Sequence, residues 1–329
     1  MNVNLKLLYL ILPAFLFVAG CSDDDDDSPV TPAANEAEML VEAMEGADGG
    51  YLNTSCPAIV KADEVYSDVT GQQNYYLIDV RGETDYTAGH VAGAQNVSIP
   101  NVLAHVQGIN AASYDKIVII CYTGQSAAWT TAMLRLSGYD NVYSMKYGMS
   151  SWHDDFDKIT TNSSNQYAGD FVTTDFAKPA AGNYPTLTTG LSSGQAILEA
   201  QIAKIYAEGF GSSAIDASTV MSDPSQYFIV NYWPAAHYTS MGHINGAMQY
   251  TPKVDLKSDA FLKTLPTDKT VVVYCYTGQT SANVAFILRV MGYDAKSLKF
   301  GTNCMIHDEM AAASLTAFGP ADIKNFPYE

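Results

Sequence analysis

The chain has 329 residues, of which 47 % are hydrophobic and 16 % are charged. This composition is typical of a globular protein long enough for two domains, and it excludes a disordered chain. The formal net charge is −18 at pH 7, and lysine and arginine form no stripe that could contact phosphates. The charge therefore argues against nucleic acid as a partner.

Residues 1–20 have the pattern of a signal peptide. Lys6 precedes the apolar stretch LLYLILPAFLFVAG, which is too short for a comfortable membrane span. This stretch leads into VAGC at residues 18–21, which resembles the lipobox of bacterial lipoproteins. The resemblance implies cleavage before Cys21, acylation of Cys21 and attachment to a membrane through its lipid chains. An ordinary signal peptide followed by an incidental cysteine is the alternative.

Residues 21–35 are expected to form an acidic tether between a lipidated Cys21 and the folded part of the chain. Five aspartates, Asp23 to Asp27, are followed by SPVTP, a sequence that favours an extended chain. An acidic run after a lipidated cysteine resembles the surface-export signal of some Bacteroidota-type lipoproteins, whereas a solvated spacer is the alternative. We expect a lipid-anchored protein of the cell envelope, on either side of the outer membrane.

One domain-sized segment occurs twice in the chain. Matching positions recur at nearly constant separation, among them Ala62 and Ala217, His90 and His243, Cys121 and Cys275, and Gly148 and Gly301. Because each copy has the size of a domain, the pattern indicates tandem duplication rather than a solenoid. We predict a first domain over 36–159 and a second over 191–329, joined by a linker over 160–190 that is rich in Thr, Asn, Ser, Gly and Pro.

Each copy shows the same order of predicted elements. A helical stretch comes first, and two apolar strands follow; the helices are 36–45 and 194–208, and the strands are 75–80, 116–120, 227–231 and 270–274. The later strand of each copy is a continuous apolar run, as in a central parallel strand buried on both faces. A helical pattern then ends at Gly138 or Gly292. The alternation predicts an α/β fold in which each domain has a mostly parallel central sheet flanked by helices.

The pentapeptide CYTGQ occurs at 121–125 and again at 275–279, each time directly after a predicted strand and before a helix. Backbone N–H groups and the positive end of the helix dipole at such a turn favour a thiolate over a thiol. Neither loop contains a lysine or an arginine, so a ring of backbone donors must supply most of this stabilisation. Gly124 and Gly278 allow the backbone to curl into such a ring.

Three motifs of the first copy resemble those of rhodanese domains. They are Asp79-Val80-Arg81, the segment GHVAGA from Gly89 to Ala94, and the cysteine loop that starts at Cys121. The short form of this loop, C-Y-x-G-x-S, is similar to that of small single-domain thiosulfate sulfurtransferases. The resemblance covers most of both repeats and implies two rhodanese-like domains, in which the histidine of the second motif is structural.

The resemblance implies transfer of sulfane sulfur by Cys121 and Cys275. Each thiolate would attack the outer sulfur of a small anionic donor such as thiosulfate or polysulfide, and cyanide, a thiol or a protein would take the sulfur from the resulting persulfide. No cofactor is implied, and no cysteine or histidine cluster has the spacing of metal ligands. The expected donor-binding residues are Tyr122, Thr123, Gly124, Gln125, Ser126, Tyr276, Thr277, Gly278, Gln279 and Thr280.

Asp79 and Arg81 are expected to support the first loop as a structural ion pair. The second copy has Asn231 and Trp233 at these positions but keeps the whole loop of Cys275. We therefore expect Cys275 to be active with a different donor or different kinetics, and an inactive scaffold is the alternative.

Cys56 and Cys304 remain after Cys21 and the two loop cysteines are assigned. They could be free or buried thiols, or they could form a disulfide with each other in an oxidising envelope. By its place in the repeat, Cys304 could instead act as a resolving thiol for a persulfide on Cys275. The sequence leaves these possibilities open.

Two other functions compete with sulfur transfer. A cysteine-dependent phosphatase needs an arginine at the sixth position after its cysteine, where this chain has Ala127 and Ser281. Phosphatase activity is therefore disfavoured. A persulfide carrier without turnover, or a rhodanese-like binding module at the cell envelope, would keep both cysteines and is the main alternative.

Overall fold

The computed structural model describes residues 35–71 and 74–329. The predicted signal peptide over 1–20, the lipidation site Cys21 and all of the tether before residue 35 lie outside these residues. Within the described part, no helix combines the length and the apolar character that crossing a membrane requires.

The first repeat is built on a five-stranded sheet in the order β1-β5-β4-β2-β3, in which all neighbouring strands are parallel. Its strands are β1 (Ile59–Val60), β2 (Tyr75–Asp79), β3 (Gln95–Asn96), β4 (Lys116–Ile120) and β5 (Val142–Met145). Its helices are α1 (Glu36–Glu45), α2 (Gly50–Thr54), α3 (Ala62–Val69), α4 (Glu83–Ala88), α5 (Val102–Gly108), α6 (Gln125–Leu136) and α7 (Met149–Trp152).

The second repeat has a sheet of the same topology, β10-β8-β11-β12-β7, again with parallel neighbours. Its strands are β7 (Ala214–Ile215), β8 (Phe228–Asn231), β10 (Met248–Gln249), β11 (Val271–Tyr274) and β12 (Ala295–Leu298). Its helices are α8 (Gly194–Ser212), α9 (Ala217–Ser222), α10 (Ala235–Met241), α11 (Gln279–Val290) and α12 (His307–Ala312). The predicted α/β fold, with a parallel sheet flanked by helices in each repeat, is confirmed.

The central strands are buried on both faces, as their apolar sequences predict. In β4, Ile117 and Ile119 face a core shared with the second repeat, whereas Val118 and Ile120 face a core under α3 and α7. The alternation follows from the two-residue period of a strand. It fixes β4, and the cysteine that follows it, between two packed layers.

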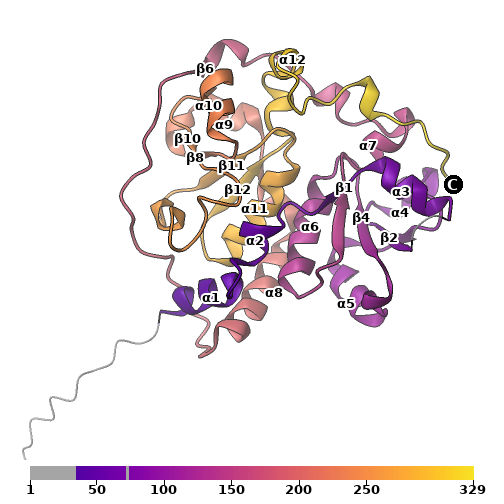
Figure 1. The fold of residues 1–329 in the computed structure, drawn as a ribbon, viewed down its shortest axis with the longest axis horizontal. Coiled ribbons are helices and arrows are strands. Elements are labelled where there is room, and N and C mark those ends of the chain that lie inside the picture. Colours follow the sequence, from indigo (N-terminus) through magenta and orange to yellow (C-terminus); the bar gives the residue numbers. More distant parts are fainter. Residues whose placement is uncertain (1–34, 72–73) are drawn as a thin grey trace, which may run out of the picture. The chain divides into compact units, whose positions relative to one another are not determined.

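The two repeats share one hydrophobic core, which lies between their sheets. Helices α6 and α11, each directly after a cysteine loop, pack against one another, and α1 packs against α8 (Figure 1). Trp129 of α6 is fully buried, stacks on Tyr206 of α8 with ring centroids 5.0 Å apart and meets Phe286 of α11 edge-on at 5.0 Å. Its indole N–H donates to Ser213 Oγ at 3.2 Å.

The segment after the first repeat crosses to the second. Strand β6 (Phe171–Val172) pairs antiparallel with β9 (His243–Ile244). The backbone N–H of Tyr167 donates to the Met305 carbonyl at 3.2 Å. Part of the predicted linker over 160–190 is therefore fixed on the second repeat, while the domain boundaries themselves stay a prediction.

The residues after the second repeat return to the first in the same way (Figure 1). The backbone N–H of Phe326 donates to the Trp152 carbonyl at 2.9 Å, and Glu329 exchanges two backbone hydrogen bonds with His90, at 2.8 and 3.0 Å. Trp152 and Met305 occupy equivalent positions in the two repeats. Each repeat is thus covered by the segment that follows the other.

Replacing Trp129 with alanine is expected to destabilise both repeats together. The change empties a buried indole site in the shared core, which costs about 3–5 kcal/mol of unfolding free energy. Denaturant unfolding should show one transition for both repeats, shifted to lower denaturant. Leu191→Ala is the control, because Leu191 is exposed and its truncation should change stability by less than about 0.5 kcal/mol. Two separate transitions, with only one of them shifted, would contradict a shared core.

Candidate active site

Cys121 lies directly after the central strand β4, in the turn that opens α6. Its side chain is 3 % exposed. Gly124, at φ 83°, bends the chain so that backbone N–H groups face the sulfur. Gly124 N donates to Cys121 Sγ at 3.1 Å and Ala127 N does so at 3.4 Å. Two fixed dipoles therefore point their positive ends at the sulfur.

Cys275 occupies the same place after β11, and its side chain is 2 % exposed. Its Sγ accepts a hydrogen bond from the backbone N–H of Ser281 at 3.4 Å. The Ser281 hydroxyl lies 3.5 Å from the same sulfur. Ser281 occupies the position where a phosphatase would have arginine, and its contact with the sulfur was not predicted from the sequence.

A glycine lies against each cysteine turn. It belongs to the loop that follows the next strand, β5 or β12. Met149 N donates to the Cys121 carbonyl at 2.8 Å, and Thr302 N donates to the Cys275 carbonyl at 3.0 Å. A Cβ atom at Gly148 or Gly301 would overlap the carbonyl oxygen of the corresponding cysteine. Both glycines have positive φ, at 56° and 57°. They hold the turns in place, and their recurrence in the two copies was the signal that could have identified this role.

The two cysteine loops contact one another through their glutamines. Gln125 Oε1 accepts from the backbone N–H of Phe300 at 2.9 Å, and Gln279 Oε1 accepts from that of Tyr147 at 3.2 Å. Gln279 Nε2 also donates to Ser144 Oγ at 3.0 Å. Both glutamines are buried. The sequence predicted that both glutamines bind the donor. In this structure their side chains contact the opposite repeat, and donor binding stays a prediction.

The other small loop residues lie at the start of the two helices. Thr123 Oγ1 accepts from the Gln125 side chain at 3.0 Å, and Thr277 Oγ1 accepts from the backbone N–H two residues later at 3.2 Å. Ser126 and Thr280 are half-buried in the first turns of α6 and α11. Donor binding by these residues stays a prediction.

Tyr122 is the loop residue that contacts the Asp79–Arg81 pair. The Arg81 guanidinium lies over its ring, 5.6 Å from the centroid. Burial, followed by the nearby Asp85 carboxylate, raises the pKa of Tyr122 to about 12. Tyr122 therefore stays neutral at physiological pH.

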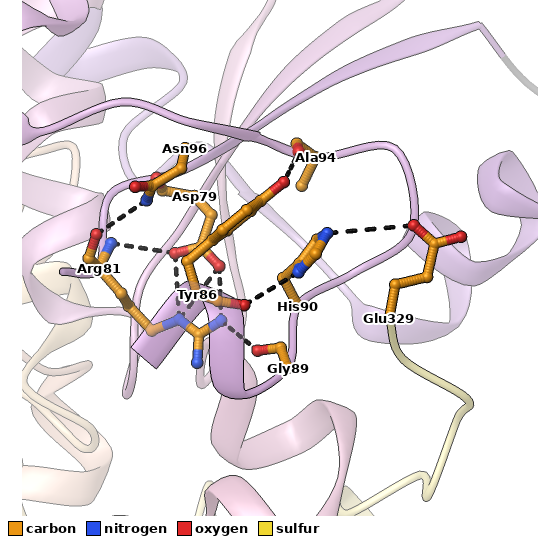
Figure 2. Close-up of polar contacts among 8 residues, drawn as sticks. All are labelled: Asp79, Arg81, Tyr86, Gly89, His90, Ala94, Asn96 and Glu329. Carbon is orange, nitrogen blue, oxygen red and sulfur yellow. Dashed lines mark hydrogen bonds and ion pairs between the residues drawn. The ribbon is translucent and has the colours of Figure 1, made fainter. Parts of the chain in front are cut away.

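Asp79 and Arg81 form a buried ion pair at the end of β2, which Figure 2 shows. Arg81 Nε and Nη2 donate to the carboxylate at 3.0 and 2.7 Å. Nη2 also donates to the Gly89 carbonyl at 2.7 Å, and Asn96 Nδ2 donates to the carbonyls of Asp79 and Arg81 at 3.0 and 2.9 Å. The pair ties β2 to the loop after α4, and its contact with Tyr122 extends this support to the cysteine turn.

His90 lies beside the same network of contacts. Its ring stacks on Tyr86 with centroids 3.7 Å apart, and Nδ1 contacts the Tyr86 carbonyl at 2.9 Å (Figure 2). Its backbone pairs with Glu329. These contacts are those of a structural residue.

The model of the rhodanese-like domain matches residues 61–155 and 215–303, which together make up more than half of the chain. The chain belongs to the rhodanese family. The tandem arrangement predicted from the sequence is thereby confirmed, with one rhodanese domain in each repeat.

Curated relatives match a single rhodanese domain. The thiosulfate sulfurtransferase GlpE of Shewanella oneidensis is 34 % identical over 87 residues, which are 26 % of this chain and 83 % of the relative. GlpE of Pseudomonas fluorescens is 32 % identical over 96 residues, which are 29 % of this chain and 85 % of the relative. The crystal structure of a rhodanese-related protein from Thermoplasma volcanium has 22 % identity and a TM-score of 0.26, covering 29 % of this chain and 89 % of that one.

The second rhodanese domain replaces the ion pair by neutral contacts. Asn231 is buried and donates to the Tyr274 hydroxyl at 2.7 Å. Trp233, at the position of Arg81, stacks on Tyr276 with centroids 4.9 Å apart. The Tyr276 hydroxyl contacts His237 Nδ1. A stacked pair of rings therefore supports the second loop where a cation supports the first.

Cys56 and Cys304 are free thiols, as are both loop cysteines. Burial raises the pKa of Cys56 and of Cys304 to about 12. Cys304 Sγ donates to the carbonyls of Gly301 and Lys299 at 3.0 and 3.2 Å. Ser151, at the equivalent position of the first domain, makes the same two bonds through its hydroxyl. Cys304 thus acts as a local hydrogen-bond donor, and the disulfide between Cys56 and Cys304 is not formed.

Replacing Asp79 with asparagine is expected to lower the unfolding free energy by about 3–5 kcal/mol, because it leaves the Arg81 charge buried without a counter-ion. Asn231→Ala is the matched change in the second domain. It removes one neutral hydrogen bond to Tyr274 and should cost only about 1–3 kcal/mol. The unfolding free energies of both variants are measured with denaturant. Equal losses of unfolding free energy would show that the ion pair contributes no more to stability than the neutral hydrogen bond.

Cys56 is expected to resist alkylation in the folded protein. With a pKa of about 12, only about one thiol in ten thousand is ionised at pH 8. Because the folded pKa is raised, the stability gained from the neutral thiol is complete below about pH 9 and is lost as the pH rises towards 12. Peptide mass spectrometry after iodoacetamide treatment at pH 8 should find Cys56 unmodified when native and modified in guanidinium. Rapid native labelling would contradict this assignment.

Proposed function

We propose that this rhodanese is a sulfurtransferase in which Cys121 and Cys275 carry sulfane sulfur as persulfides. The observation that carries the proposal is the placement of Cys121 Sγ at the end of β4, with two backbone N–H groups directed at it. The names of the relatives, thiosulfate sulfurtransferases, support the same reaction class. Thiosulfate or polysulfide would be the donor, and a thiol, cyanide or a protein the acceptor.

The proposed reaction has two half-reactions. In the first, the Cys121 thiolate attacks the outer sulfur of thiosulfate, the sulfur–sulfur bond of the donor breaks, and sulfite leaves with the bonding electron pair. In the second, an acceptor thiolate attacks the outer persulfide sulfur, and the Cys121 thiolate is released. The sulfur of Cys121 carries negative charge before the first step and after the second, and the persulfide is anionic between them. Gly124 N and Ala127 N would stabilise these anions without reorganising.

The surroundings of the two loops favour different donors. The support of the first loop includes the carboxylates of Asp79 and Asp85 and the guanidinium of Arg81. In the second domain, Trp233 and His237 stand beside Tyr276. A carboxylate near Tyr122 opposes the approach of a dianion, whereas the second loop has no carboxylate at the equivalent position. We therefore propose that Cys275 accepts the more highly charged donors.

The proposed place of action is the cell envelope. VAGC at residues 18–21 and the acidic run after it support a lipid anchor in the outer membrane, with the catalytic part held on a charged tether. A protein acceptor in the same compartment is part of this proposal. A persulfide carrier without turnover is the competing function.

Sulfite release from thiosulfate, with cyanide as the acceptor, tests the enzyme function. Cys121→Ala and Cys275→Ala should each remove the contribution of one site, and the double change should lower the rate by about a thousandfold or more, because the nucleophile is lost. Cys304→Ser is the control, since Ser151 makes the same hydrogen bonds in the first domain, and its rate should be unchanged.

A mass increase of one sulfur atom on each loop peptide, after polysulfide treatment, separates the two functions. Persulfides together with sulfite release support the enzyme. Persulfides without release from any donor support the carrier, and the absence of both contradicts both functions. If Cys121→Ala alone abolishes release, the second domain is a scaffold.

A further inference from the structure

The two cysteine loops share CYTGQ but differ at the sixth residue after the cysteine. Ala127 and Ser281 occupy this position, and both are fully buried. Their backbone N–H groups lie at the same distance, 3.4 Å, from the sulfur of their own loop. The Ser281 hydroxyl, 3.5 Å from Cys275 Sγ, is therefore an addition to an otherwise equivalent contact.

Ser281 is part of a buried chain of hydroxyl groups. Its Oγ lies 2.8 Å from the Oγ of Ser297 on β12, and Ser297 Oγ donates to the Gly278 carbonyl at 3.3 Å. Both serines are fully buried. Each hydroxyl has one hydrogen to donate and two lone pairs to accept with, so the bond between the two serines can reverse its direction by rotation of their hydrogens, while the Gly278 carbonyl only accepts.

The first domain does not have this arrangement. Ser144 of β5 is the counterpart of Ser297, but its hydroxyl accepts from Gln279 Nε2 at 3.0 Å and donates to the Ala58 carbonyl at 3.4 Å. Ala127 has no hydroxyl to offer to Cys121. The first sulfur instead receives a second backbone bond, from Gly124 N at 3.1 Å. Among the hydrogen bonds of the described residues, Cys275 Sγ has the Ser281 hydroxyl where Cys121 Sγ has the backbone N–H of Gly124.

We propose that Ser281 is a catalytic residue of the second site, where its hydroxyl donates a hydrogen bond to the anionic sulfur of Cys275 as thiolate and as persulfide, with Ser297 orienting it. In the neutral thiol, the S–H donates to Ser281 Oγ. When Cys275 loses this proton to water, Ser281 turns its own O–H towards the sulfur, and both serines keep their protons. A hydrogen bond to a charged acceptor is stronger than a neutral one, so the hydroxyl favours the anion.

Three buried groups that interact with Cys275 stay neutral over the pH range of the test. Tyr147, Tyr276 and Cys56 each have a raised pKa, mainly because they are buried, and the values for Tyr276 and Cys56 are about 12. They stay neutral below about pH 9. His237, which contacts the Tyr276 hydroxyl, is common to the parent protein and to variants of Ser281.

The test is the pH profile of iodoacetamide alkylation, followed in the full chain by mass spectrometry of each loop peptide. Ser281→Ala should slow alkylation of Cys275 about tenfold at neutral pH and raise its half-maximal pH by about one unit, since one hydrogen bond to the thiolate is lost. Ser281→Thr should restore the profile. Cys121, read in the same sample, should be unaffected. Because alanine occupies the same position in the first domain, Ser281→Ala is expected to fold.

Ser297→Ala is the second variant and should shift the Cys275 profile in the same direction by a smaller amount, because Ser281 keeps its hydroxyl but loses its orienting partner. An unchanged Cys275 profile in Ser281→Ala, or an equal shift at Cys121, would overturn the proposal. The persulfide part of this role rests on the proposed function. Alkylation requires no sulfur donor, so failure of sulfur transfer and failure of the Ser281 assignment give different results.

Discussion

The structure depends on holding a sulfur anion in a loop that has no cationic residue of its own. Neither cysteine loop contains a lysine or an arginine, so fixed dipoles must stabilise the charge, and dipoles act only where they are aimed. This explains why rigid elements surround Cys121: a strand buried on both faces before it, a helix start after it and Gly148 against its carbonyl. Misplacing the turn by a small distance would redirect the donors away from the sulfur.

The two repeats form one body with a shared core rather than two separately packed domains. The Trp129 cluster joins both sheets, and Gln125 and Gln279 connect each cysteine turn to the backbone of the other repeat. With this support from across the interface, the second domain keeps its loop although Asn231 and Trp233 replace the ion pair of the first. The residues around the Cys275 loop could therefore change while the loop itself was kept.

Local features of the sequence predicted the central part of the fold and the place of each cysteine. The apolar runs that became β4 and β11 and the cysteine turns are set by burial and by helix-start geometry, which neighbouring residues determine. The predicted helix 194–208 was too short: in the structure α8 continues four residues beyond Glu208, across a kink at Gly209 with φ 75°. The partners of Gln279 and the pairing of Ser281 with Ser297 depend on how distant segments are placed, and no local pattern encodes them.

Because each repeat is covered by the segment that follows the other, the first repeat cannot be completed until the second has been made. The residues that pair with His90 follow the second repeat in the chain, so a newly made first repeat lacks the segment that covers it in the complete structure. This pairing must wait until the second repeat has been synthesised. During this interval the backbone groups of His90 lack their partner, and the incomplete protein is more prone to associate with other chains.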